Sequence, residues 1–310
     1  MRRYKSFNLS PGNTPLIKLE RLPEPGSADI YVKYEGANPT GSMKDRMAFS
    51  MIEGAERRGE LKPGYTVVEY TGGSTGSSLA MVCSIKGYHA HFVSSDAFAK
   101  EKLQTMRAFG ADLDIIPGEN GLITAKLIDS LVKRAKELSR EPDTFWTDQF
   151  NNPDNRNAYH NMANEILHAL GSTIDEFIMG VGTGGCFSGT SEVFKEEIPD
   201  IRCIALEPLN VRSLSGGDTS GTHKLEGIGA GFIPSICRLD LADNIMAVSD
   251  EDARDTARKL ARLEGIFGGT TSGANVWAAI QRARIIGSGK KIVTIICDSG
   301  LKYLNSDLYR

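Results

Sequence analysis

Short runs of apolar residues alternate along this chain with longer stretches whose apolar residues recur at the spacing of an amphipathic helix. The predicted strands cover residues 66–70, 89–93, 113–116, 177–181, 203–206 and 292–296. The predicted helices cover residues 77–86, 97–109, 122–138 and 188–195. Continuous apolar strands that alternate with helices are typical of parallel sheets with both faces covered. The pattern therefore predicts an α/β fold.

The length of the chain indicates how this α/β pattern is divided. A chain of 310 residues, of which 40% are hydrophobic and 24% are charged, can bury a large core. Chains of this size are expected to fold as about two domains. We therefore expect two domains, each a twisted and mostly parallel sheet flanked by helices.

The charge and the cysteine content exclude several classes of function. The net charge of −3 provides no overall basic field for nucleic acid. No apolar run is long enough to span a membrane. The five cysteines are scattered without metal-ligand spacing, which indicates reduced thiols in a cytoplasmic protein. We therefore expect no nucleic-acid partner, no membrane contact and no bound metal.

Lys44 is the candidate nucleophile. It stands just inside a predicted helix, in the segment 38–46 with the sequence Asn-Pro-Thr-Gly-Ser-Met-Lys-Asp-Arg. Ser42 can cap this helix, and Asp45 is placed to reach back to it in an acidic variant of the capping box. The positive end of the helix dipole, together with burial, should lower the pKa of the Lys44 amine and favour Schiff-base chemistry. Because a lone lysine is more often an ordinary solvated side chain, this prediction depends on the loops that follow.

Two glycine-rich loops each join a predicted strand to a predicted helix. Residues 71–76 have the sequence Thr-Gly-Gly-Ser-Thr-Gly, and residues 182–186 have the sequence Gly-Thr-Gly-Gly-Cys. Such loops present backbone N–H groups at a helix N-terminus, where anions bind, although glycine turns also serve packing alone. Neither loop is a P-loop or a complete dinucleotide-binding motif. Two anion sites and a helix-start lysine together suggest a phosphate-bearing cofactor, a carboxylate substrate and a Schiff-base amine.

The motifs resemble those of the cysteine synthase (O-acetylserine sulfhydrylase) and cystathionine β-synthase family, which are pyridoxal-phosphate enzymes of the tryptophan synthase β-type fold. The resemblance extends over about residues 13–304, and its motifs occur in the family's order. The matching segments are residues 13–16, 38–46, 71–76, 148–150, 182–186, 226–234 and 269–273.

The resemblance implies that pyridoxal phosphate is the cofactor and lies in a cleft between the two domains. Lys44 would bind it covalently and would later act as the catalytic base. The other cofactor-binding residues would be Ser74, Gly182, Thr183, Gly184, Gly185, Cys186, Thr271 and Ser272. Thr271 aligns better with the hydroxyl that contacts the pyridine nitrogen, whereas Ser272 can instead cap a helix that begins near Ala274. A hydroxyl is too weak an acid to keep that nitrogen protonated, which favours elimination and replacement over transamination.

The same resemblance implies where the substrate binds and how the chain is organised. The substrate would contact Thr71, Gly72, Ser74, Thr75, Gln149 and Gly229. Residues 45–148 would form a smaller mobile domain that closes over the substrate, and residues 1–44 and 149–310 would form the larger cofactor-binding domain. Family members are usually homodimers, so we expect a homodimer here.

Three positions depart from the family pattern. Gly72 replaces a serine that helps to hold the carboxylate, and Ser74 replaces an asparagine that contacts both cofactor and substrate. Cys186 replaces a threonine that donates to the phosphate. A serine has one donor hydroxyl where an asparagine amide has two N–H donors, and a thiol is a poor donor. These changes either alter which substrate fits or are neutral.

The resemblance favours a cysteine synthase, which converts O-acetyl-L-serine and sulfide into L-cysteine and acetate. Residues 230–232, Ala-Gly-Phe, resemble the cysteine synthase form of the late glycine motif, which we define as residues 226–234. One alternative is β-replacement with another donor (O-phosphoserine or serine) or another nucleophile (homocysteine or an amine) in specialised amino-acid biosynthesis. A second alternative is a non-catalytic protein that only binds serine acetyltransferase, a common partner of cysteine synthases. The intact Lys44 and Gln149 argue against this second alternative.

Overall fold

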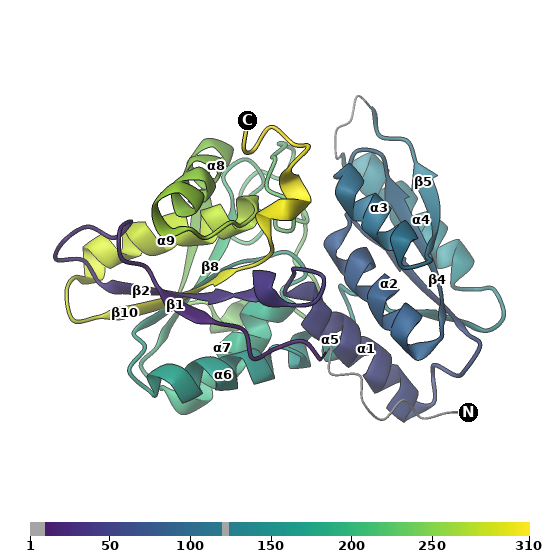
Figure 1. Ribbon diagram of the computed structural model, residues 1–310, viewed down its shortest axis with the longest axis horizontal. Coiled ribbons are helices and arrows are strands. Elements are labelled where there is room, and N and C mark those ends of the chain that lie inside the picture. The colour runs from purple at the N-terminus through teal and green to yellow at the C-terminus, as the bar shows by residue number, and fades with distance from the viewer. Residues whose placement is uncertain (1–9, 120–123) are drawn as a thin grey trace.

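The polypeptide forms two β-sheets that are covered by helices (Figure 1). The computed structural model describes residues 10–119 and 124–310. The larger sheet has six strands in the order β1-β2-β10-β7-β8-β9. Its strands are β1 (Leu16–Lys18), β2 (Asp29–Tyr34), β7 (Glu176–Gly180), β8 (Arg202–Pro208), β9 (Asn244–Val248) and β10 (Lys291–Ile296). β1 and β2 pair antiparallel, and the other neighbouring strands pair in parallel.

The smaller sheet has four parallel strands in the order β5-β4-β3-β6. Its strands are β3 (Thr66–Tyr70), β4 (His89–Ser95), β5 (Asp112–Ile116) and β6 (Thr144–Trp146). Successive side chains of a strand point to opposite faces of the sheet. Accordingly, Val67 and Phe92 join the core formed with α2 (Ser74–Lys86) and α3 (Lys100–Ala108). Val68 and Val93 join a separate cluster formed with α4 (Ala125–Leu138).

The larger sheet carries α8 (Asp250–Lys259) and α9 (Thr270–Ile286) on one face and α6 (His160–Leu170) and α7 (Gly185–Glu197) on the other (Figure 1). Helices α1 (Lys44–Arg58) and α5 (Pro153–Asn157) join the helices of the smaller sheet to those of the larger sheet. α1 packs against α2 and α5, and α5 packs against α7. Short helical segments are η1 (Glu35–Ala37), η3 (Leu239–Leu241), η4 (Leu260–Glu264) and η5 (Gly300–Tyr303).

The predicted α/β fold with mostly parallel sheets is confirmed. The predicted strands correspond to β3, β4, β5, β7, β8 and β10 to within a few residues. The sequence analysis does not predict β1, β2, β6 and β9. β1 and β6 are only three residues long, and β2 carries polar side chains. The first residues of the predicted helix 122–138 lie outside the described residues, and α4 begins at Ala125.

The described structure also bears on membranes and metals. Within residues 10–119 and 124–310, no helix is both long and apolar enough to cross a membrane. Across the same described ranges, no three side chains of His, Cys, Asp or Glu gather where they could hold a metal ion. All five cysteines are free thiols, and Cys237 is the one that is only half-buried.

The carboxyl ends of β3 and β7 each lead into a glycine-rich loop that the sequence singles out, and the end of β10 contacts the segment that carries Lys44. β3 is followed by residues 71–76, and β7 is followed by residues 182–186. β10 is followed by Cys297, whose carbonyl accepts a hydrogen bond from Met43 N over 2.9 Å. Ligands of open α/β sheets bind outside the carboxyl ends of the strands. We therefore expect the ligand-binding site at this edge of the sheets.

Candidate active site

Lys44 is the first residue of α1, and the backbone around it is attached to the end of β10. Met43 N donates to the Cys297 carbonyl over 2.9 Å, and Ser42 pairs with Asp298 in an isolated β-bridge. Ser42 Oγ accepts a hydrogen bond of 3.2 Å from Lys44 N. The lysine therefore projects from a junction that is fixed on both sides by hydrogen bonds.

The predicted capping box is wrong. The N-cap of α1 is Met43 rather than Ser42, and Asp45 does not reach back to Ser42. Instead, Asp45 Oδ2 accepts from Thr40 N over 2.7 Å, and Asp45 Oδ1 accepts from Thr40 Oγ1 and Ser78 Oγ, both over 2.5 Å. Since Ser78 belongs to α2, Asp45 connects two helices. A partner so distant in the sequence leaves no local signal.

The surroundings of Lys44 lower the pKa of its amine. Burial, which disfavours the charged form, is the main cause, and the charge of Lys102 acts in the same direction. The nearby carboxyl group of Asp298 opposes this shift. Burial raises the pKa of the Cys186 thiol to about 12, so this group stays protonated. A lowered lysine pKa increases the share of neutral amine, which is the form that attacks a carbonyl group.

The loop of residues 71–76 lies beside Gln149. Thr75 Oγ1 donates to Gln149 Oε1 over 2.8 Å, and Gln149 Nε2 donates to Tyr70 O over 2.9 Å. Thr71 Oγ1 accepts from two backbone N–H groups of its own loop, over 3.0 and 3.1 Å. These hydrogen bonds hold the loop at the N-terminus of α2, where the N–H groups of the first turn attract an anion.

Gly72 and Ser74, two of the positions that depart from the family pattern, flank the start of α2. A Cβ atom at Gly72 would lie 3.1 Å from Phe98 Cε1, so a larger residue there requires the ring to move. Ser74 is the first residue of α2 and follows Gly73, which has a φ of 127°. The absence of a side chain at position 72 therefore allows the Phe98 ring to pack close to the backbone.

Glu69 is a site residue that the sequence pattern did not predict. It is fully buried on β3, and its carboxyl oxygen Oε2 accepts from Thr147 Oγ1 over 2.6 Å and from Gln149 N over 3.0 Å. It thereby fixes the backbone that carries the Gln149 amide. A lone carboxyl group in the otherwise apolar run 66–70 is the signal that could have identified it, since such groups are rarely buried without partners.

Replacement of Glu69 by glutamine is expected to change how stability depends on pH. Burial raises the pKa of Glu69 from 4.5 to about 7, although hydrogen bonds to its carboxylate oppose the shift. Between these values the folded protein binds more protons than the unfolded chain. The contribution of Glu69 to the free energy of unfolding therefore falls as the pH rises through this window, by up to about 3 kcal/mol.

Because E69Q lacks this titration, the variant should gain stability relative to the wild type by that amount between about pH 4.5 and pH 8. Denaturant unfolding of both proteins across this range measures the difference. Glu53→Gln, at an exposed position, is the control and should show no such trend. Parallel stability curves for E69Q and the wild type would contradict the raised pKa.

The second glycine loop lies at the N-terminus of α7, and close neighbours leave no room for side chains there. A Cβ atom at Gly182 would lie 2.1 Å from the Gly227 carbonyl oxygen, and one at Gly185 would lie 2.3 Å from Asn155 Oδ1. Gly184 has a φ of 82°, which favours glycine. The chain therefore presents bare backbone at this helix start.

Asn155 connects Gln149 to the second glycine loop, and it is a second site residue that the sequence pattern did not predict. Its Nδ2 donates to Gln149 O over 2.7 Å and to Thr183 Oγ1 over 3.0 Å. Thr183 Oγ1 also accepts from Gly185 N over 3.4 Å, so the Thr183 hydroxyl proton can be donated to a ligand. Asn155 lies on α5 in a polar segment, where one more asparagine carries no distinguishing signal.

The donors at the second loop fit the phosphate of pyridoxal phosphate. The first-turn N–H groups of α7 have no intrahelical partners, and the helix dipole favours a negative charge at this end. The Thr183 hydroxyl adds a side-chain donor, whereas the Cys186 thiol is a weak one. The amine of Lys44 supplies the nucleophile that a cofactor aldehyde requires.

Thr271 and Ser272, the two candidate partners of a pyridine nitrogen, both lie in the first turn of α9. Thr271 Oγ1 donates to Glu226 O over 2.7 Å, and Ser272 Oγ accepts from Cys297 N over 3.0 Å. The expectation that Ser272 caps a helix beginning near Ala274 is wrong, because α9 already includes both residues. The hydroxyl of Ser272 instead ties α9 to the end of β10.

Gly229 lies beside the strand that precedes the second glycine loop. Its N–H donates to Val181 O over 3.0 Å, and its φ is 72°. A Cβ atom there would lie 2.5 Å from Pro208 Cγ, so glycine is required for packing. Its contact with substrate remains a prediction.

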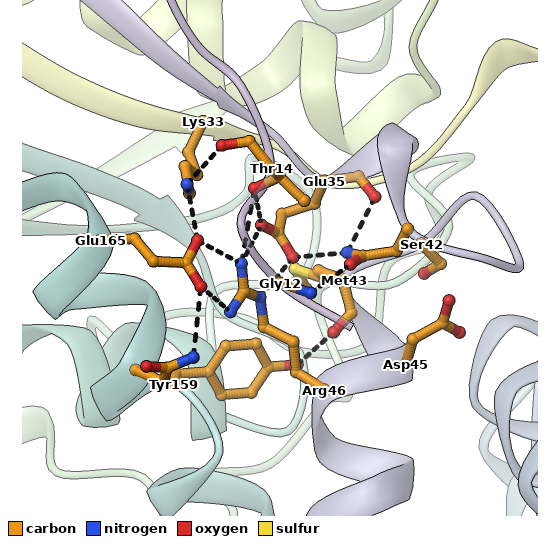
Figure 2. A network of polar contacts seen from close by, with 12 residues as sticks. Gly12, Thr14, Lys33, Glu35, Ser42, Met43, Asp45, Arg46, Tyr159 and Glu165 are labelled. Atoms are coloured by element: carbon orange, nitrogen blue, oxygen red, sulfur yellow. Dashed lines mark hydrogen bonds and ion pairs between the residues drawn. The ribbon is translucent and has the colours of Figure 1, made fainter. Parts of the chain in front are cut away.

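A buried ion network holds the other side of α1 (Figure 2). Arg46 donates through Nε and Nη2 to the two carboxyl oxygens of Glu35, over 2.7 and 2.8 Å. It donates through Nη1 and Nη2 to those of Glu165, over 2.8 and 2.9 Å. Lys33 Nζ lies 2.7 Å from Glu165 Oε2. The network joins α1 to β2, η1 and α6, and so fixes the helix that begins with Lys44.

Known proteins match this chain over nearly its whole length. A cysteine synthase of Staphylococcus aureus (strain N315) is 44% identical over 300 residues, which cover 96% of this chain and 94% of the relative. The structure of a hydrogen sulfide-producing enzyme from Fusobacterium nucleatum has a TM-score of 0.89 and 39% identity, over 95% of this chain and 98% of that chain. The structure of an O-acetylserine dependent cystathionine β-synthase from Helicobacter pylori has a TM-score of 0.91 and 36% identity, over 100% of both chains.

Residues 7–298 match the family described as pyridoxal-phosphate dependent enzyme. The chain therefore belongs to this pyridoxal-phosphate dependent family, and pyridoxal phosphate is its cofactor.

Proposed function

We propose that this enzyme catalyses β-replacement on an amino acid and is a cysteine synthase, which converts O-acetyl-L-serine and sulfide into L-cysteine and acetate. The observation that carries the proposal is a chain of hydrogen bonds that runs from Thr75 through Gln149 and Asn155 to Thr183. It joins the residues that we propose bind the substrate carboxylate to those that we propose bind the cofactor phosphate, as an amino-acid substrate on a phosphate-bearing cofactor requires. Relatives named cysteine synthase, 44% identical over 300 residues, support the same reaction.

The proposed roles follow from the chemistry of each group. Pyridoxal phosphate, when bound, withdraws electrons from the α-carbon of the amino acid, so that its α-proton and β-substituent can leave. Lys44 Nζ would hold the cofactor covalently and would also be the base that takes the α-proton of the substrate. Thr183 and the backbone of residues 182–186 would bind the phosphate, and Thr271 would contact the pyridine nitrogen. The substrate contacts are Thr71, Gly72, Ser74, Thr75, Gln149 and Gly229.

A second candidate reaction uses a thiol amino acid such as homocysteine as the nucleophile. Gly72 and Ser74 place shorter side chains at the start of α2 than the family pattern has. The Helicobacter pylori protein described as an O-acetylserine dependent cystathionine β-synthase matches the whole chain, which also favours this candidate.

The two candidates are tested by the identity of the product. Purified enzyme loaded with pyridoxal phosphate is incubated with O-acetyl-L-serine and sulfide, and the products are identified by mass. Parallel reactions replace the donor by O-phosphoserine or serine, and the nucleophile by homocysteine or an amine. Cysteine as the fastest product supports the first candidate, and cystathionine as the fastest supports the second. No product from any combination would overturn both.

The organisation of the enzyme is part of the same proposal. We propose that residues 45–148 move as a smaller domain that closes over the substrate, and the separate sheet formed by β3, β4, β5 and β6 supports this division. Membership of the family supports a homodimer in the cytoplasm and a serine acetyltransferase as a protein partner. Light scattering of the enzyme, with and without that partner, measures both assemblies; a monomer that binds nothing would refute them.

A further inference from the structure

Lys102 lies between two parts of the candidate active site: the loop of residues 71–76, which follows β3 of the smaller sheet, and the late glycine motif, which lies beside the larger sheet. Its side chain, on α3, is 3% exposed. Its aliphatic carbons pack over Gly73, because a Cβ atom there would lie 2.5 Å from Lys102 Cβ. Ser77 Oγ donates to Lys102 O over 3.5 Å. The start of α3 therefore supports the loop of residues 71–76 from behind.

The amine of Lys102 reaches the opposite part of the site. Lys102 Nζ lies 2.5 Å from Glu226 Oε2 and 4.8 Å from the centroid of the Tyr303 ring. Glu226 begins the late glycine motif and is tied to α9, because its N–H donates to Thr270 Oγ1 over 3.2 Å and its carbonyl accepts from Thr271 Oγ1 over 2.7 Å. The ion pair thus connects the loop of residues 71–76 to the first turn of α9.

The environment keeps Lys102 charged in its buried position. Burial opposes the charge, but the nearby carboxylates of Glu226 and Asp298 outweigh it and raise the pKa of Lys102. A second contact ties the start of α3 to the C-terminal segment, since Asn305 N donates to Glu101 Oε1 over 2.8 Å. The first turn of α3 is therefore held both to the late glycine motif and to the C-terminal segment.

We propose that the ion pair between Lys102 and Glu226 positions the loop of residues 71–76 against the late glycine motif and thereby sets the affinity of the enzyme for its amino-acid substrate. Lys44 is held by hydrogen bonds around the end of β10, and residues 182–186 are held by bonds at the start of α7. Neither the Lys102 amine nor the Glu226 carboxylate takes part in these bonds. Loss of the pair therefore weakens substrate binding and spares cofactor retention. The inference rests on the proposed function only in that residues 71–76 bind the substrate carboxylate.

The test is a spectral titration of the holoenzyme with L-alanine, which has the amine and carboxylate of a substrate but no β-leaving group. Its binding changes the cofactor's absorbance, so the titration measures a Kd without turnover. K102Q and E226Q should each raise this Kd at least about tenfold. The double variant should raise it by less than the product of the two factors, because the interaction is lost only once. K102R keeps the charge and should stay within about threefold of the wild type.

A matched control is K126Q, which removes an exposed lysine–glutamate pair to Glu119 with a 2.7 Å contact and should leave the Kd unchanged. The amount of pyridoxal phosphate retained per chain should equal that of the wild type in every variant. During turnover, K102Q and E226Q should raise the KM for the donor more than they lower kcat.

The inference is overturned if K102Q and E226Q both bind L-alanine within about twofold of the wild type, or if they lose cofactor in proportion to substrate affinity. Where K102Q does not fold, E226Q and K102R decide the same question. The L-alanine titration does not depend on which amino-acid donor the enzyme uses. An enzyme that shows these shifts but makes no cysteine would refute the proposed reaction and keep the role of the ion pair.

Discussion

Replacement of Lys44 by alanine is expected to abolish covalent retention of pyridoxal phosphate and to lower the rate of β-replacement at least about 10³-fold. Alanine has no amine to hold the cofactor or to remove the α-proton. The lowered pKa of the Lys44 amine, caused mainly by burial, suits both tasks. Borohydride reduction followed by peptide mass analysis detects the attachment, and the rate of cysteine formation measures the activity.

The control for this prediction is Lys290→Ala, which removes an exposed ion pair with Asp175 and should keep both cofactor and activity. In the wild type, the reduced cofactor should be found on the peptide that contains Lys44. Attachment to Lys102 or Lys302, the buried lysines at the same site, would refute the assignment. So would a K44A variant whose activity stays within about tenfold of the wild type.

Replacement of Arg46 by methionine is expected to lower the free energy of unfolding by about 3–5 kcal/mol. The substitution leaves Glu35, which is fully buried, and Glu165, which is largely buried, without the guanidinium that binds both carboxylates. An uncompensated buried charge costs more than the intact ion pair contributes. Urea unfolding of the holoenzyme at pH 7 measures the loss. Because the network holds α1, part of the activity should be lost as well.

The same network has a defined dependence on pH. Burial alone would raise the pKa of Glu165, but hydrogen bonds from Arg46 and Lys33 outweigh it and lower the pKa to about 2. The stabilisation from Glu165 is therefore complete above its ordinary pKa of 4.5 and is lost as the pH falls towards 2. In R46M this loss should be smaller, so the stability of the variant should fall less steeply in acid.

Two variants calibrate the Arg46 prediction. R46K keeps the charge but loses the planar fork that binds two carboxylates, so its stability should lie between those of R46M and the wild type. Arg284→Met breaks an exposed pair with Glu24 and should cost less than about 1 kcal/mol. An R46M variant as stable as R284M would show that the buried network does not stabilise the fold.

Much of the fold could be predicted because its central strands are buried on both faces. Residues 66–70, 177–181 and 292–296 lie in continuous apolar runs, and each corresponds to a strand in the middle of a parallel sheet. The prediction failed where the local pattern is weak. β6 has three residues and takes its place only by pairing with β3. The start of α9 was placed too late, because its first turn consists of Thr, Thr, Ser and Gly, which resemble a loop.

The candidate site divides in the same way between local and distant determinants. Lys44 at a helix start and the loops 71–76 and 182–186 could be recognised because their chemistry depends on residues that are neighbours in the chain. The partners that position them could not. Glu69 and Asn155 fix Gln149 and Thr183 through contacts that form only when strands and helices pack.

By itself, the sequence determined the type of chemistry: a lysine nucleophile, two anion-binding loops and an α/β fold that carries them at strand ends. Tertiary structure alone decided how these parts are held. Asp45 bonds to Ser78 of α2 instead of capping its own helix, and Lys102 pairs with Glu226, which is 124 residues away. Backbone periodicity and loop composition act over a few residues, whereas a buried charge selects its partner only after folding has removed water and brought distant segments together.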